Sequence, residues 1–260
     1  ARQGDEIVSA GNLYGGTYTQ FDAILPQQGI TVRFAPVNDF AATDAAINPK
    51  TRALYIETVG NPALEIADIE GYAKLAKKHH IPLVVDATFT PPTLLRPIEH
   101  GANIVIHSLS KWIGGHGTGI GGAVIDAGNF DWSDPKFALY NEPDRGYHGL
   151  RFAHDLDDLN ALAYILRLRT VGLRNQGPTL APDAAWIFLQ GVESLPLRMA
   201  RHSENAFRVA EYLAHHSKVA WVKYPGLTGG ALAARYLPNG AGGMVVFGVH
   251  GVAEKARYLV

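Results

Sequence analysis

One stretch of the sequence, residues 107–122, sets a single lysine among serines and glycines. It reads HSLSKWIGGHGTGIGG, and Lys111 follows Ser108 and Ser110. A lysine amine can form a Schiff base with a carbonyl group, and hydroxyls and backbone N–H groups can hold a phosphate. Residues 117–122, however, also fit the G-x-G-x-x-G pattern of a dinucleotide-binding turn. The stretch therefore supports two hypotheses, covalent chemistry at a lysine or the binding of a nicotinamide cofactor.

The dinucleotide hypothesis fails on its structural context. A dinucleotide turn needs a preceding strand and a helix that begins within its glycines. Here the glycines lead directly into residues 123–126, AVID, which are typical of a strand. Glu142 lies about 20 residues further on, where a ribose-binding acid is expected, but it sits beside Pro143 in a predicted loop. We therefore reject this hypothesis.

Other polar residues follow predicted strands. Asp86 and Thr88 come after the apolar residues 82–85, and Glu57 and Asn61 come after residues 52–56. In open α/β sheets, ligands bind beyond the carboxyl ends of the strands, so these residues and Lys111 are expected at one rim. The set suits a pyridoxal phosphate site, in which a lysine forms a Schiff base and a carboxylate pairs with the pyridine nitrogen. Taken alone, Lys111 could equally be a surface lysine, and Asp86 could be a helix cap.

Composition narrows the possible functions further. The chain has 260 residues, a net charge of −1 and no cysteine, and no apolar run approaches the roughly 20 residues that span a bilayer. We therefore expect neither a nucleic-acid nor a membrane partner. The sequence has no H-E-x-x-H metal motif and no G-x-S-x-G nucleophile elbow, so we expect no metal site and no serine hydrolase.

The hydrophobic pattern predicts an α/β fold with a mostly parallel sheet and helices on both faces. A helix is expected over 68–80, with Asp68 as its N-cap, and residues 129–158 are expected to form a long surface excursion. Two domains are predicted, 1–177 and 178–260, with a hinge at 177–179. The predicted strands are 6–10, 30–35, 52–57, 82–86, 104–107, 123–126 and 244–249, and the later helices are 159–171, 183–190, 195–215 and 252–260.

Four motifs together resemble a known family. They are NLYGGTYTQF (12–21), ETVGNP (57–62), VVDATF (84–89) and HSLSKWIGGHGT (107–118), and they occur in the family's order and spacing. The chain resembles the Cys/Met-metabolism family of fold-type I pyridoxal phosphate enzymes, and is most similar to its O-acetylhomoserine sulfhydrylase branch. The resemblance implies an aspartate-aminotransferase-like fold with pyridoxal 5'-phosphate as cofactor, and a smaller C-terminal α+β domain of which this chain contains a part.

The resemblance also implies a role for individual residues. Lys111 would carry the Schiff base and move protons, Asp86 would pair with the pyridine nitrogen, and Tyr14 would stack on the ring and assist proton transfer. The other cofactor contacts would be Ser108 and Ser110 to the phosphate, Asn61 to the phenolic oxygen, and Thr88 supporting the ring. An upstream phosphate-binding turn and a Tyr-x-Arg pair would precede Ala1, and the arginine that binds the substrate carboxylate would follow Val260.

The implied reaction is γ-replacement, in which O-acetyl-L-homoserine and sulfide, or a small thiol, give homocysteine, or methionine, and acetate. Trp112 and the string 115–118, GHGT, favour this branch, because sibling lyases typically have tyrosine and a G-H-S-D-like string there. Ala87 departs from the asparagine common in much of the family. A lyase acting on cystathionine or methionine, or a catalytically silent scaffold, remains the alternative. The family further implies a cytoplasmic homotetramer with sites shared between subunits.

Overall fold

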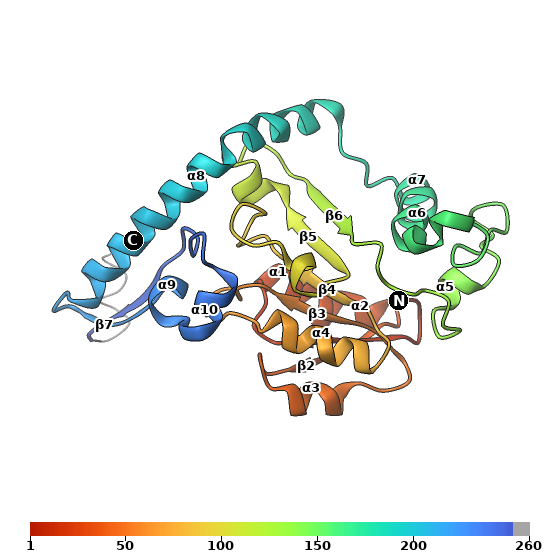
Figure 1. Cartoon of the computed structure of the whole chain (residues 1–260), viewed down its shortest axis with the longest axis horizontal. Helices are drawn as coiled ribbons and strands as arrows, with labels where there is room; N and C mark the ends of the chain where they lie inside the picture. Colours follow the sequence, from red (N-terminus) through yellow and green to blue (C-terminus); the bar gives the residue numbers. More distant parts are fainter. Residues whose placement is uncertain (252–260) are drawn as a thin grey trace.

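A six-stranded sheet forms the centre of the protein, in a computed structural model that describes residues 1–251 (Figure 1). Its strand order is β2-β1-β3-β4-β5-β6. The first five strands are parallel, and β6 runs antiparallel to β5. Their bounds are β1 Glu6–Ala10, β2 Thr31–Ala35, β3 Thr51–Glu57, β4 Leu83–Asp86, β5 Ile104–Ser108 and β6 Gly122–Asp126. Six of the seven predicted strands are thus present in this sheet, and their ends differ from the prediction by a residue at most.

The antiparallel direction of β6 has a local cause. A parallel neighbour needs a crossover of a dozen or more residues, usually through a helix that packs on the sheet. The 13 residues between β5 and β6 form no such crossover, because the Leu109 N–H donates to the Gly121 carbonyl at 2.9 Å and so holds both ends of the connection at the same edge of the sheet. The lysine-bearing stretch therefore forms the tip of an antiparallel connection.

Both faces of the sheet are covered, as the hydrophobic pattern predicts. Because side chains alternate along a strand, Leu54 and Ile56 enter one core cluster whereas Tyr55 enters another. Helices α3 (Phe40–Ala46) and α4 (Ile69–Lys78) pack against the first of these faces. On the other face, the helical segment after β1 contributes buried Phe21. This segment comprises α1 Gly15–Thr19, η1 Gln20–Ile24 and α2 Leu25–Gln27.

The start of α4 confirms the predicted cap. The Asp68 side chain accepts a hydrogen bond from the Gly71 N–H at 3.3 Å, which satisfies one of the free N–H groups of the first turn. The helix buries Ile69 and Tyr72, and its lysines face solvent.

Residues 129–158 cross the surface as expected, but they also carry a core of their own. Trp132, Phe137 and Phe152 are buried together in this segment. Short helical elements accompany them: α5 Ala138–Asn141, η4 Asp157–Leu162, α6 Ala163–Arg167, η5 Leu168–Leu173 and α7 Arg174–Gln176. The helix predicted over 159–171 is therefore divided among three of these elements.

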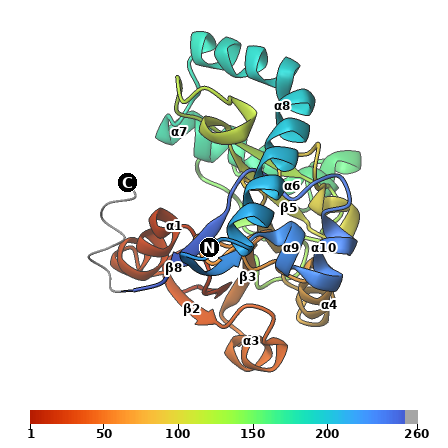
Figure 2. The same cartoon turned by 90° about the vertical axis from the view of Figure 1, so that its left-hand side faces the viewer.

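The two helices predicted at 183–190 and 195–215 are wrong, because one helix, α8 (Pro182–Ala214), runs through both. Pro196 lies inside it, although proline removes a helical hydrogen bond. Packing stabilises this turn, since Leu195 and Met199 are buried against Ile113. In Figure 2, α8 descends from the top of the molecule to its middle.

The C-terminal part holds a second, two-stranded sheet of β7 (Val219–Lys223) and β8 (Val246–Val249). Two short helices join these strands, α9 (Pro225–Thr228) and α10 (Gly230–Tyr236). The domain boundary at 177 and 178 stays a prediction; Gly177 ends α7 in the left-handed conformation. The helix predicted over 252–260 lies outside the described residues.

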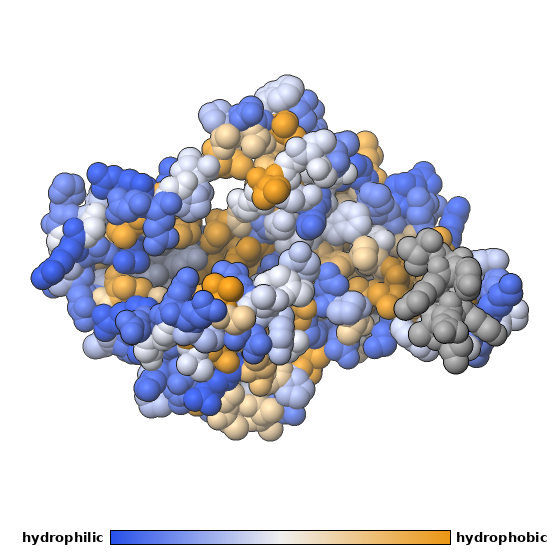
Figure 3. All heavy atoms as spheres, turned by 180° about the vertical axis from the view of Figure 1, so that it is seen from behind, coloured by the Kyte–Doolittle hydropathy of each residue, from blue (hydrophilic) through white to orange (hydrophobic). Residues whose placement is uncertain are grey.

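The surface is hollowed on the side shown in Figure 3, and hydrophobic residues lie within the hollow. Among the described residues, no helix is long and apolar enough to cross a membrane.

Candidate active site

The carboxyl ends of β3, β4 and β5 meet at one edge of the sheet. Glu57 of β3 is the register partner of Asp86 of β4, and Asp86 is the register partner of Ile106 of β5. Side chains that follow these strands are therefore brought together, as the strand pattern predicts.

A cavity of about 440 Å³ opens at this edge. All seven predicted site residues line it, although they come from four separate segments: Tyr14, Asn61, Asp86, Thr88, Ser108, Ser110 and Lys111. The volume falls within the range of small-ligand pockets.

Tyr14 stands between β1 and α1, and its ring is half-exposed. Its backbone N–H donates to Oε1 of Glu57 at 2.8 Å. A Cβ added to Gly16 would lie 2.6 Å from Cε1 of the Tyr14 ring, whereas one added to Gly15 would meet nothing within 4 Å. Within the LYGGTY string, Gly16 must therefore lack a side chain if the Tyr14 ring is to lie where it does.

Asp86 has partners on both of its carboxylate oxygens. The Thr88 N–H donates to Oδ1 at 2.8 Å, and the Tyr55 hydroxyl lies 3.4 Å from Oδ2. The Thr88 hydroxyl in turn accepts from the Ser108 N–H at 2.9 Å. These contacts hold the carboxylate at the cavity wall, where it can meet a cationic ring nitrogen.

Lys111 lies in the turn after β5, with φ −97° and ψ −123°, which is not a helical conformation. Hydrogen bonds from two other parts of the chain hold this turn in place. Ser110 accepts a hydrogen bond from the Gly121 N–H at 3.0 Å, and Arg198 of α8 donates to the carbonyls of Trp112 (2.7 Å) and Ile113 (3.1 Å). Helix α8 therefore holds the backbone that follows the lysine.

The glycines after Lys111 serve two purposes. Gly115 and Gly117 line the cavity. Gly119 and Gly121 instead pack against Phe188 of α8, where a Cβ would come within 3.0 Å and 2.5 Å of the Phe188 ring. A strand, not a helix, follows these glycines, which confirms that they are not a dinucleotide-binding turn.

Four further side chains line the cavity, although the sequence did not assign them to the site. They are Val59, Phe89, Trp112 and Met244. Trp112 adjoins the lysine, so its position in the sequence was a usable signal. Met244 comes from the C-terminal part of the chain, and no local pattern connects it to Lys111.

Glu57 also lines the cavity, and sequence reasoning gave it no role. It is 5% exposed. Burial raises the pKa of its carboxyl group, the Tyr14 N–H lowers it, the negative charge of Asp86 raises it and the Asn61 N–H lowers it, and the resulting pKa is about 7. Burial lowers the pKa of His107 on β5, which favours the neutral imidazole.

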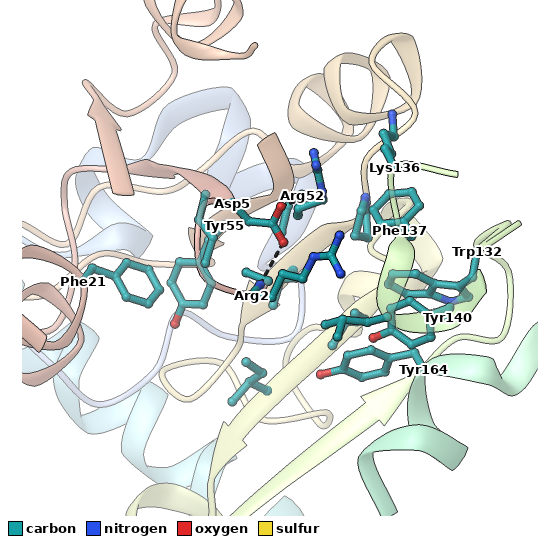
Figure 4. A pocket seen from close by; sticks show the side chains of 18 of the residues that line it. Arg2, Asp5, Phe21, Arg52, Tyr55, Trp132, Lys136, Phe137, Tyr140 and Tyr164 are labelled. Atoms are coloured by element: carbon teal, nitrogen blue, oxygen red, sulfur yellow. Dashed lines mark hydrogen bonds and ion pairs between the residues drawn. The ribbon is translucent and has the colours of Figure 1, made fainter. Parts of the chain in front are cut away.

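A second cavity, of about 450 Å³, also borders Asp86 (Figure 4). Its wall includes the aromatic rings of Trp132, Tyr140 and Tyr164, with the Trp132 and Tyr164 centroids 5.6 Å apart. Arg2 also lines this cavity, and its backbone N–H donates to Asp5 at 2.8 Å. Of the predicted site residues only Asp86 reaches it, so the predicted chemistry belongs to the first cavity.

The first cavity fits pyridoxal phosphate by the chemistry of its side chains. A carboxylate for the ring nitrogen, an amine for the aldehyde and two hydroxyls for the phosphate line one space. Because Gly16 has no side chain, the Tyr14 ring can lie against it and keep its aromatic face beside that space.

Comparison with known proteins decides the family. The sequence matches the family described as "Cys/Met metabolism PLP-dependent enzyme" over residues 1–260. The chain belongs to this family. Pyridoxal phosphate is accordingly its cofactor, and the fold is that of the fold-type I enzymes, as the motifs predicted.

Among members of the Cys/Met family, the chain is 47% identical to an O-acetyl-L-homoserine sulfhydrylase of Leptospira meyeri, over 99% of this chain and 60% of that protein. It is 46% identical to a homocysteine synthase of Schizosaccharomyces pombe, over 100% of this chain and 61% of that one. A solved structure of a putative O-acetylhomoserine (thiol)-lyase of Campylobacter jejuni, with N'-pyridoxyl-lysine-5'-monophosphate, superposes with a TM-score of 0.89 at 35% identity, covering 96% and 62% of the two chains. The chain thus spans about three fifths of the length of these relatives.

Proposed function

We propose that the protein catalyses γ-replacement, in which O-acetyl-L-homoserine and sulfide, or a small thiol, give homocysteine, or methionine, and acetate. The observation that carries this proposal is the gathering of Lys111, Asp86 and Tyr14 with four further polar residues around one cavity. The named activities of relatives at 46–47% identity give the substrate class.

Each residue has a role that follows from its position. Bound pyridoxal phosphate withdraws electrons from the substrate carbons and so makes their protons acidic. The Lys111 amine stands on a flexible stem, so it can remove a proton from the α-carbon and return protons to neighbouring carbons. Asp86, held by the Thr88 N–H, keeps the ring nitrogen protonated. Lys111 would also remove a proton from the β-carbon, and loss of acetate from the γ-carbon would then leave a carbon–carbon double bond to which the thiol would add, the protons returning to the α- and β-carbons.

The remaining residues bind and orient. Ser108 and Ser110 offer hydroxyls to the phosphate; the Ser110 oxygen accepts from the Gly121 N–H, and its proton remains free to donate. When the cofactor is bound, Asn61 would face its phenolic oxygen, Thr88 would support the ring and Tyr14 would cover the face of the ring. Small-molecule substrates, a homotetramer with shared sites and a cytoplasmic location complete the proposal, on the family resemblance alone.

The test uses the complete protein, the matched variants Lys111→Ala and Lys74→Ala, and added pyridoxal phosphate. Lys74 is an exposed lysine of α4 and serves as the control. We expect the visible absorbance of bound cofactor and sulfide-dependent homocysteine formation in the wild type and in Lys74→Ala, and neither in Lys111→Ala. A colourless wild type would refute the cofactor assignment. Release of a ketoacid from methionine or cystathionine, without homocysteine formation, would indicate a sibling lyase.

A further inference from the structure

Glu57 is the one buried carboxyl group of the cavity wall whose role the proposed reaction leaves open. It ends β3, next to Asp86 in register, and its side chain is turned into the site instead of towards solvent. A buried carboxyl group is costly unless it is hydrogen-bonded, so its partners indicate its purpose.

The partners of Glu57 are backbone groups of two other site segments. Oε1 accepts from the Tyr14 N–H at 2.8 Å, in the segment between β1 and α1. The backbone N–H of Asn61, in the loop after β3, lowers the pKa of this carboxyl group and so also favours its ionised form. One side chain therefore joins the two segments that carry Tyr14 and Asn61, both of which line the cavity.

Hydrogen bonds to an ionised acceptor are shorter and roughly twice as strong as those between neutral groups. Burial and the negative charge of Asp86 outweigh this gain at Glu57, because they raise its pKa to about 7, so ionisation loosens the hold on the two segments. The groups that face it are Asp86 on β4, Tyr55 on β3 and the Tyr14 segment, and Lys111 lines the same cavity. Asp86 and burial oppose the charge, whereas the two N–H groups favour it.

We propose that Glu57 is a positioning residue that fixes the Tyr14 and Asn61 segments around the cofactor, firmly when its carboxyl group is protonated and less firmly when it is ionised. The inference rests on the proposed cofactor-binding function of this cavity. It makes the organisation of the site depend on pH in the range around 7, where the carboxyl group changes charge.

The experiment compares three variants. Glu57→Gln keeps an acceptor oxygen but removes the charge, Glu57→Leu removes both, and Glu65→Gln makes the same charge change at an exposed position of the neighbouring loop. Two quantities are measured from pH 5.5 to 8.5. The first is the hydrogen exchange of peptides 12–21 and 57–63 in the cofactor-free protein, corrected for the intrinsic rate. The second is the dissociation constant of pyridoxal 5'-phosphate.

In the wild type and in Glu65→Gln we expect both peptides to become less protected as the pH rises through 7, because the buried carboxyl group then ionises. Glu57→Leu should lose roughly tenfold or more of this protection at pH 5.5, because the Tyr14 N–H is left without its partner. Glu57→Gln should recover part of it and should show no dependence on pH near 7. If Glu57 had only a structural role, both Glu57 variants would be less stable. Glu57→Gln would then keep the pH dependence of the wild type.

Protection that is the same in Glu57→Gln as in the wild type at every pH would overturn the inference, whether or not Glu57→Leu folds. A wild type that fails to bind pyridoxal phosphate would contradict the proposed function instead. The exchange measurement needs no cofactor, so the two failures can be distinguished.

Discussion

The hydroxyl of Thr88 accepts a hydrogen bond from the backbone N–H of Ser108, and this contact joins the chain after β4 to the end of β5. The same threonine donates its own N–H to Asp86. One residue thus links the carboxylate for the ring nitrogen to the start of the lysine turn.

Replacing Thr88 by valine keeps the shape but removes the acceptor. The Ser108 N–H is left without its partner, so we expect a loss of about 1–3 kcal/mol in the free energy of unfolding and weaker cofactor binding. Denaturant unfolding and cofactor titration measure the two effects. Thr88→Ser keeps the hydroxyl and should restore both; equal losses in the two variants would disprove the role of this hydrogen bond.

Two adjacent glycines give opposite predictions. A methyl group on Gly16 would meet the Tyr14 ring at 2.6 Å, whereas one on Gly15 would enter open space. Both residues begin α1, where alanine is favoured over glycine by roughly 0.5–1 kcal/mol. Gly15→Ala should therefore stabilise the protein and leave cofactor affinity unchanged, and Gly16→Ala should displace Tyr14 and weaken that affinity. Equal affinities in the two variants would contradict the assigned position of the ring.

Arg198 fastens α8 to the lysine turn. It donates to the carbonyls of Trp112, Ile113 and Gly191. Arg198→Met removes all three donors, and we expect a loss of about 3 kcal/mol or more in stability, since each buried carbonyl without a partner costs about 1–3 kcal/mol. Arg201→Met, one turn away and exposed, removes only a surface ion pair with Glu204 and should cost under about 1 kcal/mol. Chemical denaturation of both variants checks this, and similar losses would refute the anchoring role.

Asp86→Asn tests the charge at the ring nitrogen. The amide can still accept the Thr88 N–H, so the fold should be retained, but the anionic partner is lost. A hydrogen bond to a charged group is worth about 1.5–3 kcal/mol, so we expect kcat/KM to fall at least about tenfold in the complete enzyme. Asp22→Asn, at an exposed position of η1, is the control and should keep full activity. Unchanged kinetics in Asp86→Asn would remove Asp86 from the proposed mechanism.

The pKa of Glu57 predicts how stability changes with pH in the cofactor-free protein. Its folded pKa of about 7 lies above its ordinary value of 4.5, so between these values the folded state holds the extra proton. Stability from this group is therefore lost as the pH rises from 4.5 through 7, by up to about 3 kcal/mol. Glu57→Gln stays neutral, so its stability relative to the wild type should rise over the same interval. Unfolding curves at pH 4.5, 6 and 8 measure the difference, which should be absent for Glu65→Gln.

Local patterns predicted a large part of the fold. The six sheet strands are recognisable because each is a short apolar run between turn residues, and Asp68 marks the start of α4 because its side chain satisfies a free N–H within three residues. The division of α8 was wrong because Pro196 is unfavourable within a helix, and only the burial of Leu195 and Met199 against Ile113 outweighs that cost.

The sequence by itself determined which residue types could do the chemistry: one lysine after two serines, one acid after a buried strand and the motifs that identify the family. That these residues share one cavity follows from parallel strands ending at a common edge, which the order of the elements already implies. The tertiary structure alone decided three features. They are the burial of Glu57 between Tyr14 and Asp86, the position of Met244 at the cavity, and the hydrogen bonds from Arg198 to the turn that follows Lys111. They depend on long-range packing, and no local spacing in the chain encodes which distant segments will meet.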